Sequence, residues 1–285
     1  MRKGHANCTT LLLCMQGTPR RRRTRSALPS LLEIERGNGP LFATSIHAGH
    51  AIRDSLHPEL ALSDAERLRE EDPFTELWAA VCPNRVVVRR SRFEVDLNRA
   101  PTQALYKKPE DAWGLRVWRA PLSDASIAET MREYRAYYAT VLEILEDLER
   151  EYGRFVVLDL HSYNHRREGA LAPPADPRQN PDINVGTGSM DRARWGHLVD
   201  RFIADLGAQS VLGRRLDVRE NVRFQGGYLS RWVHDHFPVT GCALAIEVKK
   251  FFMDEWTGQP ETAALTAIQA ALAATLPGLL EELGR

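Results

Sequence analysis

Three short apolar segments of this chain each end at a side chain that can take part in catalysis. The segments and the residues that follow them are 41–46 with His47, 155–160 with His161, and 243–246 with Glu247. Continuous apolar runs of this length are typical of strands that are buried on both faces of a parallel sheet. Because ligands of open α/β sheets bind beyond the carboxyl ends of the strands, we expect the three side chains to share one cleft.

Helical patterns separate these apolar segments. Ser63 and Glu66 have the spacing of a capping box, which predicts a helix within 63–80, and Pro73 is expected to interrupt it. Apolar residues at helical spacing predict further helices at 125–152, 194–206 and 261–283. Additional strands are expected at 85–88 and 92–95.

The alternation of strands and helices continues through the chain, without an internal repeat or a low-complexity linker. It predicts an α/β fold: a single-domain sandwich with a mixed, largely parallel sheet that is flanked by helices. With 285 residues, 43% of them hydrophobic, the chain can bury a core without disulfides or a structural metal. We predict that this domain occupies residues 29–285.

The N-terminal segment differs from the rest of the chain in charge. Residues 1–26 carry seven basic side chains and no acidic one, which leaves 31 basic against 38 acidic residues in the remainder. A basic run can bind nucleic acid or a membrane surface. This one lacks amphipathic periodicity and interleaved aromatic residues, and an acidic body is poorly suited to a phosphate backbone. We therefore predict that residues 1–28 are a disordered basic tail and expect neither partner.

The cysteine content and the hydropathy pattern indicate a compartment. The four cysteines show no CxxC spacing, which favours a reducing environment. No uninterrupted apolar run approaches the length of about 18 residues that a membrane helix needs, and the run 11–15 is too short for the core of a signal peptide. We therefore expect a cytoplasmic protein.

Deleting residues 1–28 is expected to leave both the melting temperature and the catalytic activity nearly unchanged. The segment has no apolar periodicity that the rest of the chain would bury. A thermal melt and an activity assay of the shortened chain test this expectation. A large drop in either quantity would show that the tail docks on the domain.

Two histidines in equivalent positions, with a carboxylate available, indicate a metal site. Zinc prefers imidazole nitrogens and a carboxylate, and in catalytic sites it keeps a fourth position open. Asp159 stands two residues before His161 and therefore points to the same sheet face. It could accept a hydrogen bond from an imidazole N–H, or it could cap a turn.

Several motifs of the chain resemble a known superfamily. The segment 158–163 resembles the second zinc-histidine motif of the zinc carboxypeptidase superfamily, and 94–99 resembles its Asp-x-Asn-Arg motif for a substrate carboxylate. The order of the motifs is more similar to that of the N-formylglutamate amidohydrolase family, which shares the fold. In chain order these motifs are 40–49, Asp72 with Glu76, 91–93 leading into 96–99, 159–163, 184–187, 224–228, and 245–248 followed by 253–255. The resemblance covers about residues 30–258.

The resemblance implies a zinc carboxypeptidase-like, phosphorylase/hydrolase-like fold and a Zn²⁺-dependent amidohydrolase. Such an enzyme removes the N-acyl group, here expected to be N-formyl, from an acidic amino acid such as N-formylglutamate by attack of an activated water. This role belongs to amino-acid catabolism. Glu247 would be the general base, and its alternative is an ion pair with Lys249 or Lys250.

The resemblance also implies the metal ligands, which would be His47, Asp72 and His161. In the carboxypeptidases a glutamate follows the first histidine by three residues, whereas this chain has His50 there. The other candidates for the third ligand are therefore His50, Glu71 and Glu76.

A second implied set of residues binds the substrate. Arg92, Asn98 and Arg99 would recognise its carboxylate, because guanidinium groups bind carboxylates with two parallel hydrogen bonds. The neighbouring Arg89 and Arg90 are alternatives to Arg92. Gly227 would let the backbone approach the ligand closely, and Tyr228 would donate its hydroxyl; a plain turn is the alternative.

The expected partner is a small N-acyl amino acid. Two other functions fit parts of the pattern: a carboxypeptidase-like zinc peptidase, whose substrate also has a free carboxylate, and a metal-free binding protein of the same fold. The joint presence of His47, His161 and Glu247 favours an enzyme. The pattern leaves open the acyl group, the preferred amino acid and the oligomeric state.

Overall fold

The structure is a computed structural model that describes residues 31–285. The predictions for residues 1–28, and the cysteines within them, lie outside the described residues. Cys82 and Cys242 are buried and free.

A sheet of seven strands forms the centre of the molecule, in the order β1-β3-β2-β4-β9-β5-β8. The strands of β3, β2, β4 and β9 run parallel, β1 pairs antiparallel with β3, and β5 pairs antiparallel with β9 and parallel with β8. Their bounds are β1 Leu32–Glu35, β2 Leu41–Ser45, β3 Asn84–Val88, β4 Phe155–Tyr163, β5 Ile183–Gly186, β8 Val218–Glu220 and β9 Gly241–Lys249. A separate hairpin pairs β6 (Ser210–Val211) with β7 (Arg214–Arg215).

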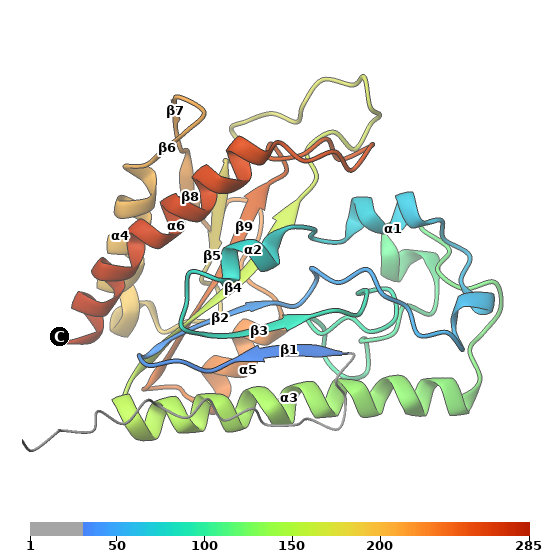
Figure 1. Cartoon of the computed structure of the whole chain (residues 1–285), viewed down its shortest axis with the longest axis horizontal. Coiled ribbons are helices and arrows are strands. Elements are labelled where there is room, and N and C mark those ends of the chain that lie inside the picture. Colours follow the sequence, from blue (N-terminus) through green and yellow to red (C-terminus); the bar gives the residue numbers. More distant parts are fainter. Residues whose placement is uncertain (1–30) are drawn as a thin grey trace, which may run out of the picture.

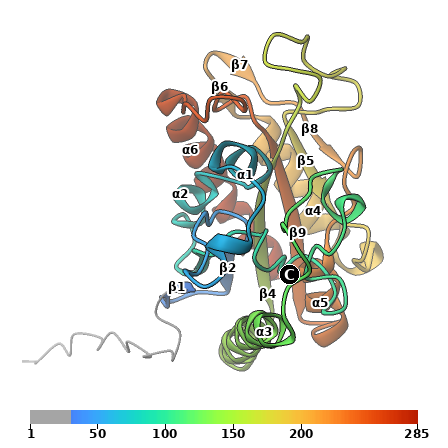
Figure 2. The ribbon, with the colours of Figure 1, turned by 90° about the vertical axis from the view of Figure 1, so that its right-hand side faces the viewer.

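Helices cover both faces of this sheet. The helices are α1 Asp64–Glu70, α2 Thr75–Ala79, α3 Asp124–Tyr152, α4 Arg192–Gly207, α5 Tyr228–His236 and α6 Thr262–Leu283, with 3-10 helices at His57–Glu59 and Pro109–Ala112. One core cluster joins α2, α4 and α6 to one face, and a second joins α3 and α5 to the other. Figure 1 shows α3 along one side of the sheet with α4 and α6 on the opposite side, and Figure 2 shows α3 nearly end-on. This arrangement confirms the predicted α/β sandwich with a mixed, largely parallel sheet.

Local sequence signals account for several helix ends. Ser63 caps α1 through a complete capping box with Glu66. Pro73 falls in the break between α1 and α2, where it was expected to interrupt the helical pattern. Gly153 ends α3 with a φ of 76°, a left-handed conformation that glycine adopts without a steric cost.

Two details of the strand prediction are wrong. Residues 92–95 form a turn and not a strand, because the carbonyl of Ser91 accepts hydrogen bonds from the N–H groups of Glu94 and Val95. In addition, β4 and β9 remain paired as far as Tyr163 and Lys249. His161 and Glu247 therefore lie within their strands, two residues before the strands end, and not beyond them.

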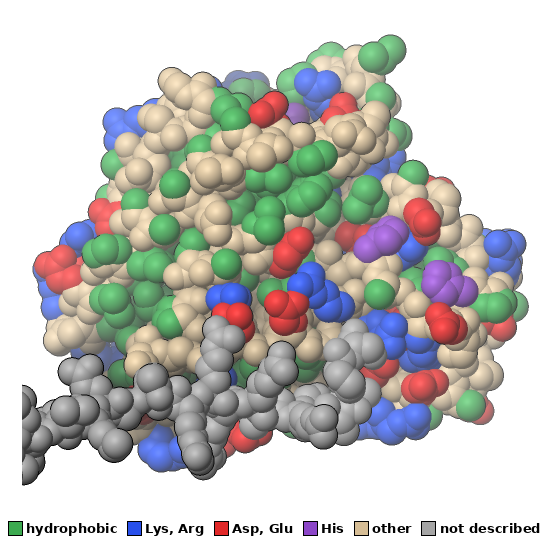
Figure 3. All heavy atoms as spheres, viewed as in Figure 1, with side chains coloured by type: hydrophobic (Ala, Val, Ile, Leu, Met, Phe, Trp, Pro, Cys, Tyr) green, Lys and Arg blue, Asp and Glu red, His purple; other side chains and the backbone are tan. Residues whose placement is uncertain are grey.

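One helix, α6, is long and apolar enough to cross a membrane by length and composition alone. Ten of its residues are buried, and it packs against α4 and the sheet, as the core helix of a globular domain does. On the face seen in Figure 3, the visible acidic and basic side chains of the described residues are interspersed.

Candidate active site

Neighbouring strands bring the three residues of the sequence pattern to one edge of the sheet. His47 lies in the turn after β2, His161 belongs to β4, and Glu247 belongs to β9. β4 lies between β2 and β9, all three strands run parallel, and His161 is directly opposite Glu247. The structure therefore brings these side chains together, as the strand pattern predicts.

Asp72 reaches the same edge from the loop between α1 and α2. Its backbone N–H donates to the carbonyl oxygen of His47 at 2.9 Å. Its own carbonyl oxygen accepts a hydrogen bond from the hydroxyl of Thr75 at 2.8 Å. These two contacts fix the loop at both sides of Asp72 and hold its carboxylate beside the turn that carries His47.

His47, Asp72 and His161 form a buried cluster that could hold a metal ion. One ligand atom from each residue lies within 4.8 Å of the other two. Oδ2 of Asp72 is 3.4 Å from Nδ1 of His47 and 3.0 Å from Nδ1 of His161. Two imidazole nitrogens and one carboxylate oxygen are a donor set that catalytic zinc sites use.

The outward-facing nitrogens of both imidazoles lie beside further carboxylates. Nε2 of His47 donates to Oδ1 of Asp96 at 2.7 Å, and Nε2 of His161 is 3.0 Å from Oδ1 of Asp159. An ionised carboxylate only accepts hydrogen bonds, so Nε2 of His47 carries the hydrogen and its Nδ1 keeps a lone pair. Both ring nitrogens of His161 lie beside a carboxylate, and these carboxylates outweigh burial and raise its pKa well above the usual range. Nδ1 of His47 is buried and has no hydrogen-bond partner among residues 31–285. Carboxylates in this position orient the histidine ligands of metal sites.

The electrostatics of the cluster favour a cation. Burial opposes ionisation of Asp72, but the neighbouring imidazoles of His161 and His47 outweigh it and hold its pKa far below the usual range. Burial also opposes ionisation of Asp96, but the charge of Arg92 and the hydrogen bond from His47 keep its pKa well below the usual range. Several ionised carboxylates thus surround two imidazoles, and a bound cation would compensate their charge.

The other candidates for the third metal ligand lie outside the cluster. Nδ1 of His50 is 2.5 Å from Oε2 of Glu71, and the second oxygen of Glu71 accepts a hydrogen bond from the hydroxyl of Ser91. Glu76 lies in the first turn of α2 and is not among the residues of the cluster. The geometry therefore favours Asp72.

The carboxylate of Glu247 faces the cavity beside this cluster. The ion pairs that would give it a structural role are not formed: Nζ of Lys249 pairs with Asp182 at 2.9 Å, and Nζ of Lys250 donates to two carbonyl oxygens. Burial raises the pKa of Glu247 to about 7, and the nearby charge of His161 counteracts this only in part. A carboxylate with such a pKa can accept a proton near neutral pH.

The cavity has a volume of about 240 Å³, which suits a small molecule. Of the predicted site residues, the structure places His47, Asp72, Arg92, Asn98, His161, Gly227 and Glu247 in its wall. Gly227 is required there by close packing, since a Cβ atom at this position would lie 2.1 Å from Oδ1 of Asn98.

Arg92 lines the cavity, but its guanidinium is already bound to other groups of the protein. It donates to Oδ2 of Asp96 at 3.0 Å, to the hydroxyl of Tyr106 at 3.1 Å and to the carbonyl of Glu70 at 3.3 Å. Its contacts therefore hold Asp96 in the position from which that carboxylate orients His47.

The structure places two predicted substrate-binding residues away from the cavity wall. Arg99 contacts Asp96 at 3.3 Å and donates to the carbonyl of Asp111 at 2.7 Å. Tyr228 begins α5 and packs its ring against that of Tyr138, with centroids 5.6 Å apart. Neither is among the residues that line the cavity.

Several residues of the site were not singled out from the sequence. They are the cavity-lining residues Glu70, Trp113 and Arg167, and the hydrogen-bond acceptor Asp96. The sequence does contain a sign that Asp96 belongs to the site, because Asp96 is the first residue of the Asp-x-Asn-Arg motif. Arg167 lies in the long connection between β4 and β5, where no sequence pattern marks its position.

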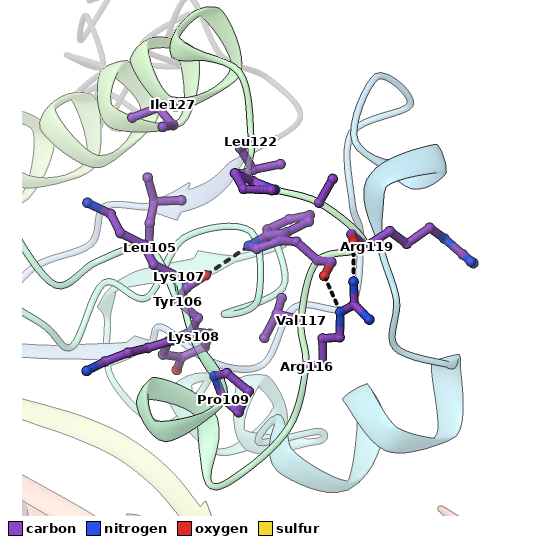
Figure 4. A pocket seen from close by; sticks show the side chains of 13 residues that line it. Leu105, Tyr106, Lys107, Lys108, Pro109, Arg116, Val117, Arg119, Leu122 and Ile127 are labelled. Atoms are coloured by element: carbon purple, nitrogen blue, oxygen red, sulfur yellow. Dashed lines mark hydrogen bonds between the residues drawn. The ribbon is translucent and has the colours of Figure 1, made fainter.

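A second, larger cavity of about 590 Å³ lies elsewhere in the molecule (Figure 4). Its wall is mainly apolar and includes Leu105, Val117 and Trp118, with the indole N–H of Trp118 bonded to the carbonyl of Tyr106. It is lined by no histidine, cysteine or acidic residue of the described chain. Since amide hydrolysis needs a base and an electrophile, the smaller cavity is the candidate active site.

Asp96→Asn is expected to weaken metal binding by about 10- to 100-fold, because removal of a carboxylate that orients a histidine ligand has effects of this size. The substitution keeps the shape of the side chain but loses its charge beside His47. Competition with a chelating dye measures the affinity, and the exposed Asp235→Asn serves as the matched control. Equal metal affinities of the Asp96 variant and the wild type would contradict this assignment.

Comparisons with known proteins agree with this fold. A model of the N-formylglutamate amidohydrolase family matches residues 39–253. The chain is 26% identical over 231 residues to an N-formylglutamate deformylase of Pseudomonas aeruginosa, which covers 72% of this chain and 78% of that protein. Its fold is similar to that of an N-formylglutamate amidohydrolase from Ralstonia eutropha JMP134, with a TM-score of 0.73 at 17% identity over 90% of this chain and 99% of the other. It is also similar to a gene product of Agrobacterium tumefaciens, with a TM-score of 0.64 at 19% identity over 90% and 97% of the two chains.

Proposed function

Because the chain belongs to the N-formylglutamate amidohydrolase family, we propose that it is a metal-dependent enzyme that hydrolyses the formamide of N-formylglutamate. The observation that carries this proposal is the juxtaposition of the His47–Asp72–His161 cluster with the carboxylate of Glu247, which pairs with neither Lys249 nor Lys250, in one small cavity. Formamides are stable near neutral pH, so their hydrolysis needs both an activated water and stabilisation of the developing oxyanion.

The donor set supports Zn²⁺ as the cofactor. Two neutral imidazoles and one carboxylate match the ligand preference of zinc, and the buried Nδ1 of His47 lacks any other partner among residues 31–285. Zinc in such a site lowers the pKa of a coordinated water to about 7 and polarises a carbonyl group. Asp96 and Asp159 would hold the two imidazoles in the tautomer that this binding requires.

Glu247 would act as the general base and then as the general acid. Its carboxylate accepts the proton of the attacking water and passes it to the nitrogen of the leaving amino acid. The position of Glu247 opposite His161 in the β4–β9 ladder supports this role, because it places the carboxylate next to the metal ligands on a rigid strand. The products are formate and glutamate.

The positive groups in the cavity wall support an anionic substrate. Arg92, Arg167 and Lys250 line the same small volume as the acidic Glu70, Asp72 and Glu247, so a bound molecule can place its carboxylates beside basic groups. We further propose that residues 29–285 form one amidohydrolase domain, which the family match over 39–253 supports. A cytoplasmic location remains a prediction from the sequence.

A hydrolysis panel tests the proposed function. The full chain, loaded with Zn²⁺, is incubated with N-formyl-L-glutamate, N-acetyl-L-glutamate, N-formyl-L-methionine and a peptide with a free carboxyl terminus. The proposal predicts release of formate from N-formyl-L-glutamate as the fastest reaction. Cleavage of the peptide alone would support a carboxypeptidase-like enzyme, and no hydrolysis of any compound would overturn the enzymatic assignment.

A further inference from the structure

The positive groups inside the cavity are all bound to other parts of the protein. The guanidinium of Arg167 donates to both carboxylate oxygens of Glu70, at 3.0 and 3.4 Å. Nζ of Lys250 donates to the carbonyl oxygens of Arg69 and Glu71, at 2.6 and 2.7 Å. The guanidinium of Arg92 is likewise occupied, as described above. A substrate with two carboxylates would therefore gain a further contact from a cation that has no such partner.

Arg223 is a cation of this kind next to the cavity: it does not line the wall itself, but it contacts two rings that do. Its guanidinium carbon lies 5.5 Å from the ring centroid of Tyr163 and 5.4 Å from that of Phe224. Both rings line the cavity. The side chain is exposed, and among residues 31–285 it forms no ion pair and no side-chain hydrogen bond. Stacking on two rings positions the planar group while leaving its N–H donors free for a carboxylate.

A hydrogen bond holds the backbone of Arg223 to β5, the strand that pairs with β9, and β9 carries the proposed general base Glu247. The amide side chain of Asn184 in β5 accepts from the N–H of Arg223 at 2.8 Å and donates to the carbonyl of Phe224 at 2.9 Å. Asn184 is fully buried and stands opposite Glu247 in the β5–β9 ladder. The position of Arg223 is therefore tied to the strand of the proposed general base.

We propose that Arg223 binds the side-chain carboxylate of the N-acyl amino acid and sets the preference for acidic over neutral substrates. This inference rests on the proposed function. The formamide reacts beside the buried metal cluster, whereas the exposed Arg223 lies next to the cavity, so it would meet the part of the substrate farthest from the reacting bond. A guanidinium and a carboxylate form two parallel, charge-assisted hydrogen bonds.

The test compares N-formyl-L-glutamate with N-formyl-L-glutamine, which has the same shape but no charge on its side chain. For Arg223→Gln, kcat/KM with N-formyl-L-glutamate is expected to fall by about 10- to 100-fold, the range of a charge-assisted contact. The loss is expected mainly in KM, because the contact is present in both ground and transition states. The value with N-formyl-L-glutamine is expected to stay unchanged, and Arg223→Lys is expected to retain part of the selectivity.

Arg215→Gln is the matched control, because Arg215 is exposed on β7 and donates to a backbone carbonyl away from the cavity. It is expected to behave as the wild type. If the wild type hydrolyses N-formyl-L-glutamate and Arg223→Gln keeps the same selectivity, the role of Arg223 is refuted while the proposed function stands. If the wild type hydrolyses neither compound, both are refuted.

Discussion

Glu247→Gln is expected to lower kcat by at least about 10²-fold, since general acid–base groups contribute about 10²- to 10⁴-fold to catalysis. Glutamine is nearly isosteric with glutamate and keeps one acceptor oxygen, but it cannot take a proton from the attacking water. Glu247 has neither Lys249 nor Lys250 as a partner, so its replacement breaks no ion pair with them. Metal content, KM and the melting temperature are therefore expected to stay close to those of the wild type.

The pH profile gives a second readout for the same variant. Activity of the wild type requires the ionised carboxylate, so it is expected to fall as the pH drops through the pKa of Glu247. Burial raises that pKa to about 7 in the metal-free chain, and a cation at the three ligands would lower it again. The acidic limb should therefore lie below pH 7 in the metal-loaded enzyme and should be absent from Glu247→Gln.

Glu143→Gln provides the control, because Glu143 is exposed on α3. It is expected to leave kcat and the pH profile unchanged. A near-normal kcat of Glu247→Gln would remove Glu247 from the mechanism. Loss of bound metal in that variant would instead make Glu247 the third ligand in place of Asp72.

His161→Ala is expected to abolish stoichiometric metal binding and, with it, the activity. The substitution removes one of two imidazole ligands and leaves the buried carboxylate of Asp159 without the imidazole nitrogen that lies 3.0 Å from its Oδ1. The fold is expected to persist, because a domain of this size does not need a catalytic metal for its core. Elemental analysis of the purified variant, together with its circular dichroism spectrum, separates these effects.

His57→Ala is the matched control, since His57 is exposed in the 3-10 helix 57–59. It is expected to keep the metal content and activity of the wild type. The variant Asp72→Ala should repeat the loss seen with His161→Ala through a different ligand. Retention of a full equivalent of tightly bound metal by His161→Ala would show that the metal assignment is wrong.

The site residues that lie on strands, or directly after them, are the ones that the sequence pattern predicts best. His47, His161 and Glu247 each follow or end a continuous apolar run, and parallel neighbours must place such residues at the same edge. The layered fold follows from the same alternation of strands and helices. Both predictions depend on periodicity, which is a local property of the chain.

The remaining site residues depend on tertiary contacts that no local pattern encodes. Asp72 was assigned through the family resemblance, and its place follows from the hydrogen bond of its N–H to the carbonyl of His47. Arg99 belongs to the right motif, yet Asp96 and the carbonyl of Asp111 bind its guanidinium outside the cavity. Arg167 enters the cavity from a long connection whose path the sequence does not specify.

We propose that a metal held by His47, Asp72 and His161 enables this cavity to hydrolyse N-formyl-L-glutamate. The most direct test is a titration of chelator-stripped protein with Zn²⁺, in which formate release is measured after each addition. The stripped protein is expected to be inactive, and its activity is expected to rise linearly with added Zn²⁺ until one ion is bound per chain. Full activity of the stripped protein, with no response to added metal, would contradict a role of the metal in this reaction.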